Sequence, residues 1–321
     1  MSSTMNRRRF LGHGAVVSVA LAASSGSVVP AAEPGEPAII DTHQHLWDLK
    51  RLRLAWLDSS KSKTLNRSFL PEDYRRATAG LNVVKSVYME VDAAPAHQEV
   101  EARWIVDLIK GRQTKTVAAV ISGRPASTGF KDYLGQFRDV PEIKGMRQVL
   151  HSGETPAGYC LDPKFVRGIR LLGEIGWSFD LCMRPGELLD GAKLALDCPG
   201  TSFILDHCGN APVFGDREGW KTDVAEVAER KNVVCKVSGI VASTAGKTWT
   251  PDDLAPIINH VLNVFGPDRV VFGGDWPVCT LGASYRQWVE ALRTVVKDRP
   301  EAERRKLFHD NAERVYRLRT V

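Results

Sequence analysis

The most informative segment of this chain reads Ile39-Ile40-Asp41-Thr42-His43-Gln44-His45. Its two isoleucines predict the start of a buried strand, and the two histidines that follow are separated by one residue. On a strand this spacing places both imidazoles on the same face, about 7 Å apart along the chain. We therefore expect His43 and His45 to act together on one ion or one substrate at the exit of the first strand.

The segment that precedes this strand has the three parts of an export signal. It contains a twin-arginine sequence at residues 6–11 and a short apolar run of small residues at 14–23, and a Ser/Val/Pro/Ala stretch follows up to Ala32. A disordered basic tail is the alternative interpretation. The apolar run is shorter than the roughly 18 residues of a membrane span, so we expect no stable span. We predict a signal peptide over residues 1–32, a mature domain over 33–321, and a periplasmic or otherwise exported protein.

The charge and the cysteine content argue against two classes of protein. The formal charge of the 321-residue chain is +5, but residues 1–32 carry three arginines and no acid, so the remainder has a charge of +2. A charge this small gives no reason to expect nucleic-acid binding. The six cysteines, of which the first is Cys160, are too few for a disulfide scaffold. Several of them lie in apolar runs, so we expect buried thiols.

Short apolar runs alternate with longer amphipathic segments from residue 38 to the end of the chain. Continuous apolar runs are typical of strands that are buried on both faces. The eight runs cover residues 38–42, 83–91, 117–122, 143–149, 177–183, 202–206, 232–237 and 270–273. Helical patterns cover residues 97–110, 163–176, 216–231, 252–265 and 284–297. This alternation predicts an α/β fold, a single-domain (β/α)8 TIM barrel. An open doubly wound sheet competes with it, but no Gly-x-Gly-x-x-Gly turn follows the first run.

Ionisable residues gather at the ends of the expected strands, where the chemistry of such barrels lies. They are His43 and His45 after the first strand, Glu90 and Asp92 after the second, Arg147 and His151 after the fourth, Arg184 after the fifth, Asp206 and His207 after the sixth, Lys236 in the seventh and Asp275 after the eighth. Each residue alone could be a capping or rim residue. Together they predict a site at the carboxyl end of the barrel.

Several segments of the chain form recognisable motifs: DTHQHLWD at 41–48, KGMRQVL at 144–150, FILDHCG at 203–209, VCKVSG at 234–239, VFGGDWPV at 271–278, and Asn311-Ala312 with Tyr316 near the end of the chain. They resemble the amidohydrolase superfamily, in its branch of lactone hydrolases that act on sugar-acid and dicarboxylate lactones. The resemblance extends in register over about residues 38–318, and it implies a barrel fold.

The resemblance implies that four residues form the catalytic cluster and bind one divalent metal ion, zinc in the first instance: His43, His45, His207 and Asp275. Such a set holds one ion with an open position for water, and the carboxylate takes the proton of that water. Catalysis without metal by the same residues is the alternative. The resemblance disfavours a site with two ions, because superfamily members with two ions use a lysine of the fourth strand and a histidine of the fifth. Here the fifth expected strand has no histidine, and Lys144 lies at the start of the fourth strand rather than at its exit.

Seven further residues are candidates for binding the substrate: Arg147, Arg184, Lys236, Glu90, Trp47, Trp276 and His151. Guanidinium groups suit a carboxylate or a polyol, although the arginines could instead form ion pairs at the barrel mouth. The two tryptophans could form a wall for a sugar ring or fill the rim. Lys236 could point inward, to stabilise an oxyanion or to pair with Glu90, or outward between helices.

The sequence therefore predicts a hydrolase that opens a sugar-acid or related carboxylated lactone, with this small molecule as its partner. A metal-dependent decarboxylase or hydratase of an unsaturated acid is the alternative on the same scaffold. A ligand-binding barrel without catalysis is a third interpretation. It is disfavoured because all four positions of the cluster are present.

Overall fold

The computed structural model describes residue 1 and residues 36–59, 63–153, 155–244 and 246–318. The predicted signal peptide lies outside the described residues, apart from Met1. The described residues from 36 onward belong to one compact unit. Among the described residues, no helix combines the length and the apolar character that crossing a membrane requires.

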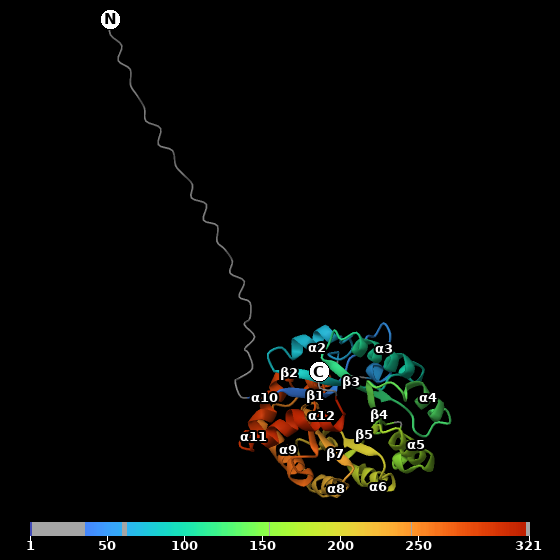
Figure 1. Ribbon diagram of the computed structural model, residues 1–321. Helices are drawn as coiled ribbons and strands as arrows, with labels where there is room; N and C mark the ends of the chain where they lie inside the picture. Colours follow the sequence, from blue (N-terminus) through green and yellow to red (C-terminus); the bar gives the residue numbers. More distant parts are fainter. Residues whose placement is uncertain (2–35, 60–62, 154, 245, 319–321) are drawn as a thin grey trace. The chain divides into compact units, whose positions relative to one another are not determined.

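Eight parallel strands form one sheet in the order of the sequence, and helices surround them (Figure 1). The strands are β1 (Ile39–Gln44), β2 (Val83–Met89), β3 (Thr116–Ser122), β4 (Ile143–Val149), β5 (Ser178–Cys182), β6 (Ser202–Leu205), β7 (Val233–Val237) and β8 (Val270–Phe272). A parallel bridge between Gln44 and Trp276 joins the ends of the first and last strands. The backbone N–H of Asp275 also donates to the carbonyl of His43 at 2.8 Å. The sheet is therefore a closed barrel.

The helices form the outer layer of the barrel. The longer ones are α3 (Gln98–Lys110), α4 (Phe130–Phe137), α5 (Pro163–Glu174), α6 (Leu188–Asp197), α8 (Glu218–Ala228), α9 (Pro251–Phe265) and α10 (Tyr285–Val296). The short ones are α1 (Trp56–Ser59), α2 (Pro71–Ala77), α7 (His207–Asn210), α11 (Glu301–Arg305) and α12 (Asn311–Val315). Single turns complete the set: η1 (Pro95–His97), η2 (Tyr159–Leu161), η3 (Pro185–Glu187), η4 (Ile240–Thr244), η5 (Val278–Leu281) and η6 (Lys306–Asp310).

The predicted barrel is confirmed, and all eight expected strands are present. Their boundaries differ from the expected ones by at most two residues, as in β2, which ends at Met89 rather than at residue 91. The expected helix over 97–110 corresponds to α3, which begins at Gln98 after the single turn η1. The strands could be predicted because every one of them is buried on both sides, which selects continuous apolar sequences.

The hydrophobic core has an outer and an inner part. The large outer part packs the sheet against the helices. Inside the barrel, small and branched residues of β2 and β3, such as Val87 and Ala118, pack against Tyr316, which follows α12. Ile40 and Val271, at the starts of β1 and β8, pack against Ala312 of α12. The end of the chain therefore closes the amino-terminal end of the barrel, and α12 lies inside the ring of outer helices (Figure 1).

Candidate active site

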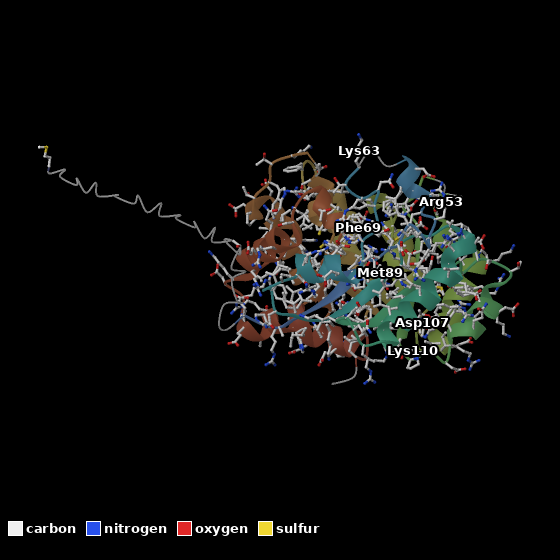
Figure 2. The ribbon with its side chains drawn as sticks, turned by 90° about the horizontal axis from the view of Figure 1, so that it is seen from above. Arg53, Lys63, Phe69, Met89, Asp107 and Lys110 are labelled. Carbon is white, nitrogen blue, oxygen red and sulfur yellow. The ribbon has the colours of Figure 1, made fainter. Side chains whose placement is uncertain are left out.

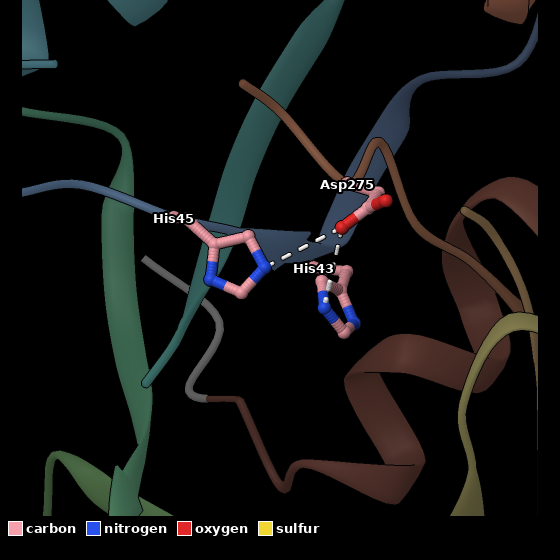
Figure 3. A group of neighbouring side chains, drawn as sticks. All are labelled: His43, His45 and Asp275. Carbon is pink, nitrogen blue, oxygen red and sulfur yellow. Dashed lines mark ion pairs between the residues drawn. The ribbon is translucent and has the colours of Figure 1, made fainter. Parts of the chain in front are cut away.

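Two histidines and an aspartate converge where β1 and β8 end (Figure 3). Nε2 of His45 lies 3.4 Å from Oδ1 of Asp275, and Nε2 of His43 lies 3.6 Å from the same oxygen. All three residues are at least 95% buried. Asp275 has a positive φ of 52°, a backbone conformation that residues other than glycine rarely adopt. This strained backbone places its carboxylate opposite the two imidazoles.

The contacts of His45 fix which of its nitrogens can bind a cation. Its Nδ1 lies 3.0 Å from the carbonyl oxygen of Met89. A carbonyl can only accept a hydrogen bond, so Nδ1 carries a proton, and in the neutral imidazole Nε2 carries the lone pair. That lone pair faces the carboxylate of Asp275. Met89, which supplies this carbonyl, lies near the centre of the fold in Figure 2, whereas Arg53 and Lys63 lie toward its edge. A backbone carbonyl behind a ligating imidazole is the usual second partner of a metal-binding histidine, so these residues fit a divalent cation.

His43 lies between this cluster and the charged interior of the barrel. Its Nδ1 lies 3.2 Å from Nζ of Lys236 and 3.4 Å from Oδ1 of Asp206. Its Nε2 lies 3.3 Å from the guanidinium of Arg147. Burial, together with the charge of Lys236, holds the pKa of His43 well below its usual value. The imidazole is therefore neutral at pH 7, as a metal ligand must be.

His207 belongs to a second group of potential ligands, with His43 and Asp206. The rings of His43 and His207 are 4.5 Å apart, and Nδ1 of His207 is 2.9 Å from Oγ of Ser238. Gly239 packs so closely on this imidazole that a Cβ atom would collide with the ring. Burial lowers the pKa of His207. His207 therefore lies beside His43, but it belongs to a different group from the one that His43 and His45 form with Asp275.

A network of buried charges lies beneath the cluster. Arg147 donates from Nε to Oε1 of Glu90 at 2.6 Å, and its Nη1 lies 3.2 Å from Oδ2 of Asp206. Nζ of Lys236 lies 2.7 Å from Oδ2 of Asp180 and 2.9 Å from Oδ1 of Asp206. All of these side chains are at least 95% buried. These carboxylates accept hydrogen bonds from Arg147, so its side chain helps to hold the site together.

The other candidates for substrate binding have varied surroundings. Lys236 takes the inward of the two orientations considered, but it pairs with Asp180 and Asp206 rather than with Glu90. Arg184 pairs with Glu187 at 2.8 Å and donates to two carbonyls of the loop after β4, so it fastens that loop. His151 is exposed in the same loop.

The two tryptophans are part of the core. Trp47 is fully buried, and its indole N–H donates to the carbonyl of Arg67 at 2.6 Å. Trp276 is 4% exposed and packs edge-to-face on Phe69 and Tyr74. Their faces are taken up by these neighbours, and the packing corresponds to the alternative in which they fill the rim.

Two buried carboxylates escaped the analysis of the sequence. Asp41 accepts the backbone N–H of His43 at 3.0 Å and that of Gly274 at 2.7 Å, and it also accepts the hydroxyls of Tyr74 and Tyr285. It thereby ties the end of β1 to the end of β8 and fixes the backbone on both sides of the cluster. Asp180 pairs with Lys236 inside the barrel. The signal in both cases was a single acid within an apolar run, which requires a buried partner.

The fold and this cluster define an α/β-barrel enzyme of the amidohydrolase superfamily. The model of the amidohydrolase family matches residues 40–318, and this chain belongs to that family. An L-fucono-1,5-lactonase of Burkholderia ambifaria is 28% identical over 295 residues, which cover 87% of this chain and 95% of the relative. An L-rhamnono-gamma-lactonase of Scheffersomyces stipitis is 23% identical, over 87% of this chain and 98% of the relative.

A solved structure shares the fold. It is that of an amidohydrolase from Burkholderia multivorans with bound zinc, with a TM-score of 0.77 and 24% identity over 88% of this chain and 100% of the other. In the present chain, the buried His43, His45 and Asp275 side chains offer three ligand atoms that fit one metal ion.

Proposed function

We propose that this protein is a lactonase that opens the ring of a sugar-acid or related carboxylated lactone with water. The observation that carries the proposal is the convergence of His43, His45 and Asp275 on one point at the carboxyl end of the barrel. The relatives named as sugar lactonases, at 28% and 23% identity, support the substrate class.

His43, His45 and Asp275 would hold a divalent ion, zinc in the first instance, and His207 would complete the set. When bound, such an ion lowers the pKa of a water molecule toward about 7 and polarises the carbonyl of the lactone. Asp275 accepts the proton of the attacking water, because its carboxylate is the acceptor group that faces both imidazoles. Without an ion, the same residues would bind the carbonyl and activate the water directly.

A screen of the purified protein tests this proposal. Opening a lactone releases a proton, so a pH indicator detects turnover of a panel of sugar lactones, and elemental analysis of the same preparation measures bound metal. A decarboxylase would instead release carbon dioxide from its substrate and would open no lactone ring. A binding protein would retain a lactone without turning it over. Absence of proton release with the whole panel, from a preparation that contains its metal, would contradict the proposal.

We also propose that the chain is exported through the twin-arginine route. The support is the sequence of residues 6–11, followed by the short apolar run of small residues. The receptor of that route reads paired guanidinium groups rather than charge alone. Changing Arg7 and Arg8 to lysine should therefore leave the protein in the cytoplasm. Normal amounts of the variant in the periplasmic fraction would refute the export proposal and leave the lactonase proposal untouched.

A further inference from the structure

His43, at the centre of the site, has two cations against its ring. Nη1 of Arg147 lies 3.3 Å from Nε2, and Nζ of Lys236 lies 3.2 Å from Nδ1. Both cations can only donate a hydrogen bond. In a neutral imidazole one ring nitrogen carries a proton, and only the other has the lone pair that accepts. One of the two cations can therefore donate to the ring, and the choice between them fixes the tautomer of His43.

The two cations differ in their freedom to turn their protons away from the ring. A guanidinium group holds its N–H bonds in a rigid planar fork, whereas the three protons of an ammonium group rotate together. Lys236 has two other acceptors, Asp180 at 2.7 Å and Asp206 at 2.9 Å. Arg147 donates from Nε and Nη2 to the carboxylate and the carbonyl of Glu90, at 2.6 and 2.8 Å, and these two bonds fix the plane of its fork. The fixed donor therefore favours a lone pair at Nε2.

The carboxylate of Asp206 favours the same tautomer from the other side of the ring. Its Oδ1 lies 3.4 Å from Nδ1 of His43. This oxygen is buried, and within the described part of the chain no donor is aligned on it as a hydrogen bond, although Lys236 lies 2.9 Å away. Paired with two cations, the carboxylate is ionised and can only accept. A proton on Nδ1 supplies the donor that a buried oxygen requires.

The alternative tautomer, with the proton on Nε2, has poorer contacts. That proton would face an N–H of Arg147 at 3.3 Å, and Glu90 holds this guanidinium in place. The acceptor on that side would be Oδ1 of Asp275 at 3.6 Å, which is beyond the range of a hydrogen bond. Oδ1 of Asp206 would also remain without an aligned donor. The contacts therefore favour the form with the proton on Nδ1.

We propose that Arg147 and Asp206 are positioning residues that hold His43 as its Nδ1–H tautomer and thereby make Nε2 the atom that meets a cation. The inference rests on the divalent ion of the proposed function and is independent of which lactone is the substrate. The Nε2 lone pairs of His43 and His45 then both lie on the side of Asp275. A carboxylate behind a ligating imidazole orients the ring and raises its basicity.

Nitrogen NMR of the metal-free full chain with isotopically labelled histidine identifies the protonated nitrogen directly, at about pH 8, where a neutral imidazole prevails. The signals of His43 are those that disappear in His43→Gln. The wild type should carry its proton on Nδ1, and a proton on Nε2 would overturn the proposal. This spectrum decides the matter even if the variants of the network do not fold.

Variants of the network test the two positioning residues separately. Asp206→Leu removes the acceptor at Nδ1, and Arg147→Met removes the fixed donor at Nε2, so each should raise the population of His43 with its proton on Nε2. Asp180→Leu is the matched control. It also removes a buried carboxylate from Lys236, which keeps Asp206 as a partner, so the wild-type tautomer should persist. A wild-type tautomer in both test variants would overturn the proposal.

Zinc affinity, measured by competition with a chelator, is a second readout that does not depend on activity. Asp206→Leu should raise the Kd for zinc about 10–100-fold, the usual effect of losing the partner behind a ligating histidine. Asp180→Leu should leave the Kd nearly unchanged, and equal losses in the two leucine variants would overturn the inference, because the charge of the network would then explain them. A wild type that binds no zinc would contradict the metal of the proposed function, whereas its NMR spectrum would still decide the tautomer.

Discussion

Replacing Lys236 with methionine should strongly destabilise the barrel. The ammonium lies 2.7 Å from Asp180 and 2.9 Å from Asp206, and all three side chains are fully buried. Asp206 would keep Arg147 as a partner at 3.2 Å, so Asp180 is the carboxylate left without a cation. Breaking a buried ion pair from one side costs about 3–5 kcal/mol, which corresponds to a decrease in Tm of about 5–8 °C for a domain of this size.

The pH dependence of this loss follows from Asp180. Burial and the neighbouring Asp206, opposed by Lys236, raise the pKa of Asp180 to about 7. A carboxyl group whose pKa is raised on folding contributes stability at low pH and loses it as the pH rises through the folded-state pKa. Without the ammonium, Asp180 must take up a proton in order to remain buried. The deficit of Lys236→Met should therefore be smaller at about pH 5 than at about pH 8.

Urea unfolding followed by circular dichroism measures the effect in wild type, Lys236→Met and the double variant Lys236→Met/Asp180→Asn. The double variant should recover about 2 kcal/mol, because it also removes the orphaned carboxylate. Lys193→Met is the control, since Lys193 pairs with Asp197 on the exposed side of α6 and should change stability by less than about 1 kcal/mol. A loss below that value for Lys236→Met, with no recovery in the double variant, would refute the reasoning.

Three further predictions concern the cluster and the core. Asp275→Asn should lower kcat about 100-fold or more for any lactone that is turned over, while calorimetry still detects binding. His45→Ala should lower the zinc content of the purified protein, measured by elemental analysis, because it removes a ligand whose lone pair faces Asp275. Burial and the charge of Glu90 raise the pKa of Glu101 to about 8, so its contribution to stability is complete below about pH 4.5 and is lost as the pH rises through 8. Urea midpoints of Glu101→Gln should therefore fall less between pH 5 and 9 than those of the wild type.

The fold could be predicted from the sequence because its strands obey one rule. Each is buried on both faces, so it appears as a continuous apolar run, and the amphipathic helices between the runs have a different period. His43 and Asp275 could be identified as candidates because they follow such runs directly. Their positions at strand exits depend on the order of the chain alone, so no knowledge of packing was needed.

The partners of these residues could not be predicted in the same way. Arg147, Arg184 and Trp47 had the right chemistry for a substrate site, but only packing shows that carboxylates, carbonyls and aromatic rings already surround them. Asp41 and Asp180 lie within apolar runs, and the identity of their partners depends on which strands are neighbours across the barrel. The sequence does show that a charge is buried, but only the fold shows what neutralises it.

The arrangement of buried charges explains how a neutral imidazole can coexist with so many ionisable groups. Glu90 and Asp206 are balanced by Arg147 and Lys236. The charge of Lys236 and the burial of the imidazole both disfavour a proton on His43. An added cation is therefore best accommodated at Asp275, where no lysine or arginine pairs with the carboxylate among the described residues. The fixed cations beneath the cluster thus direct any added positive charge to the place where the proposed chemistry needs it.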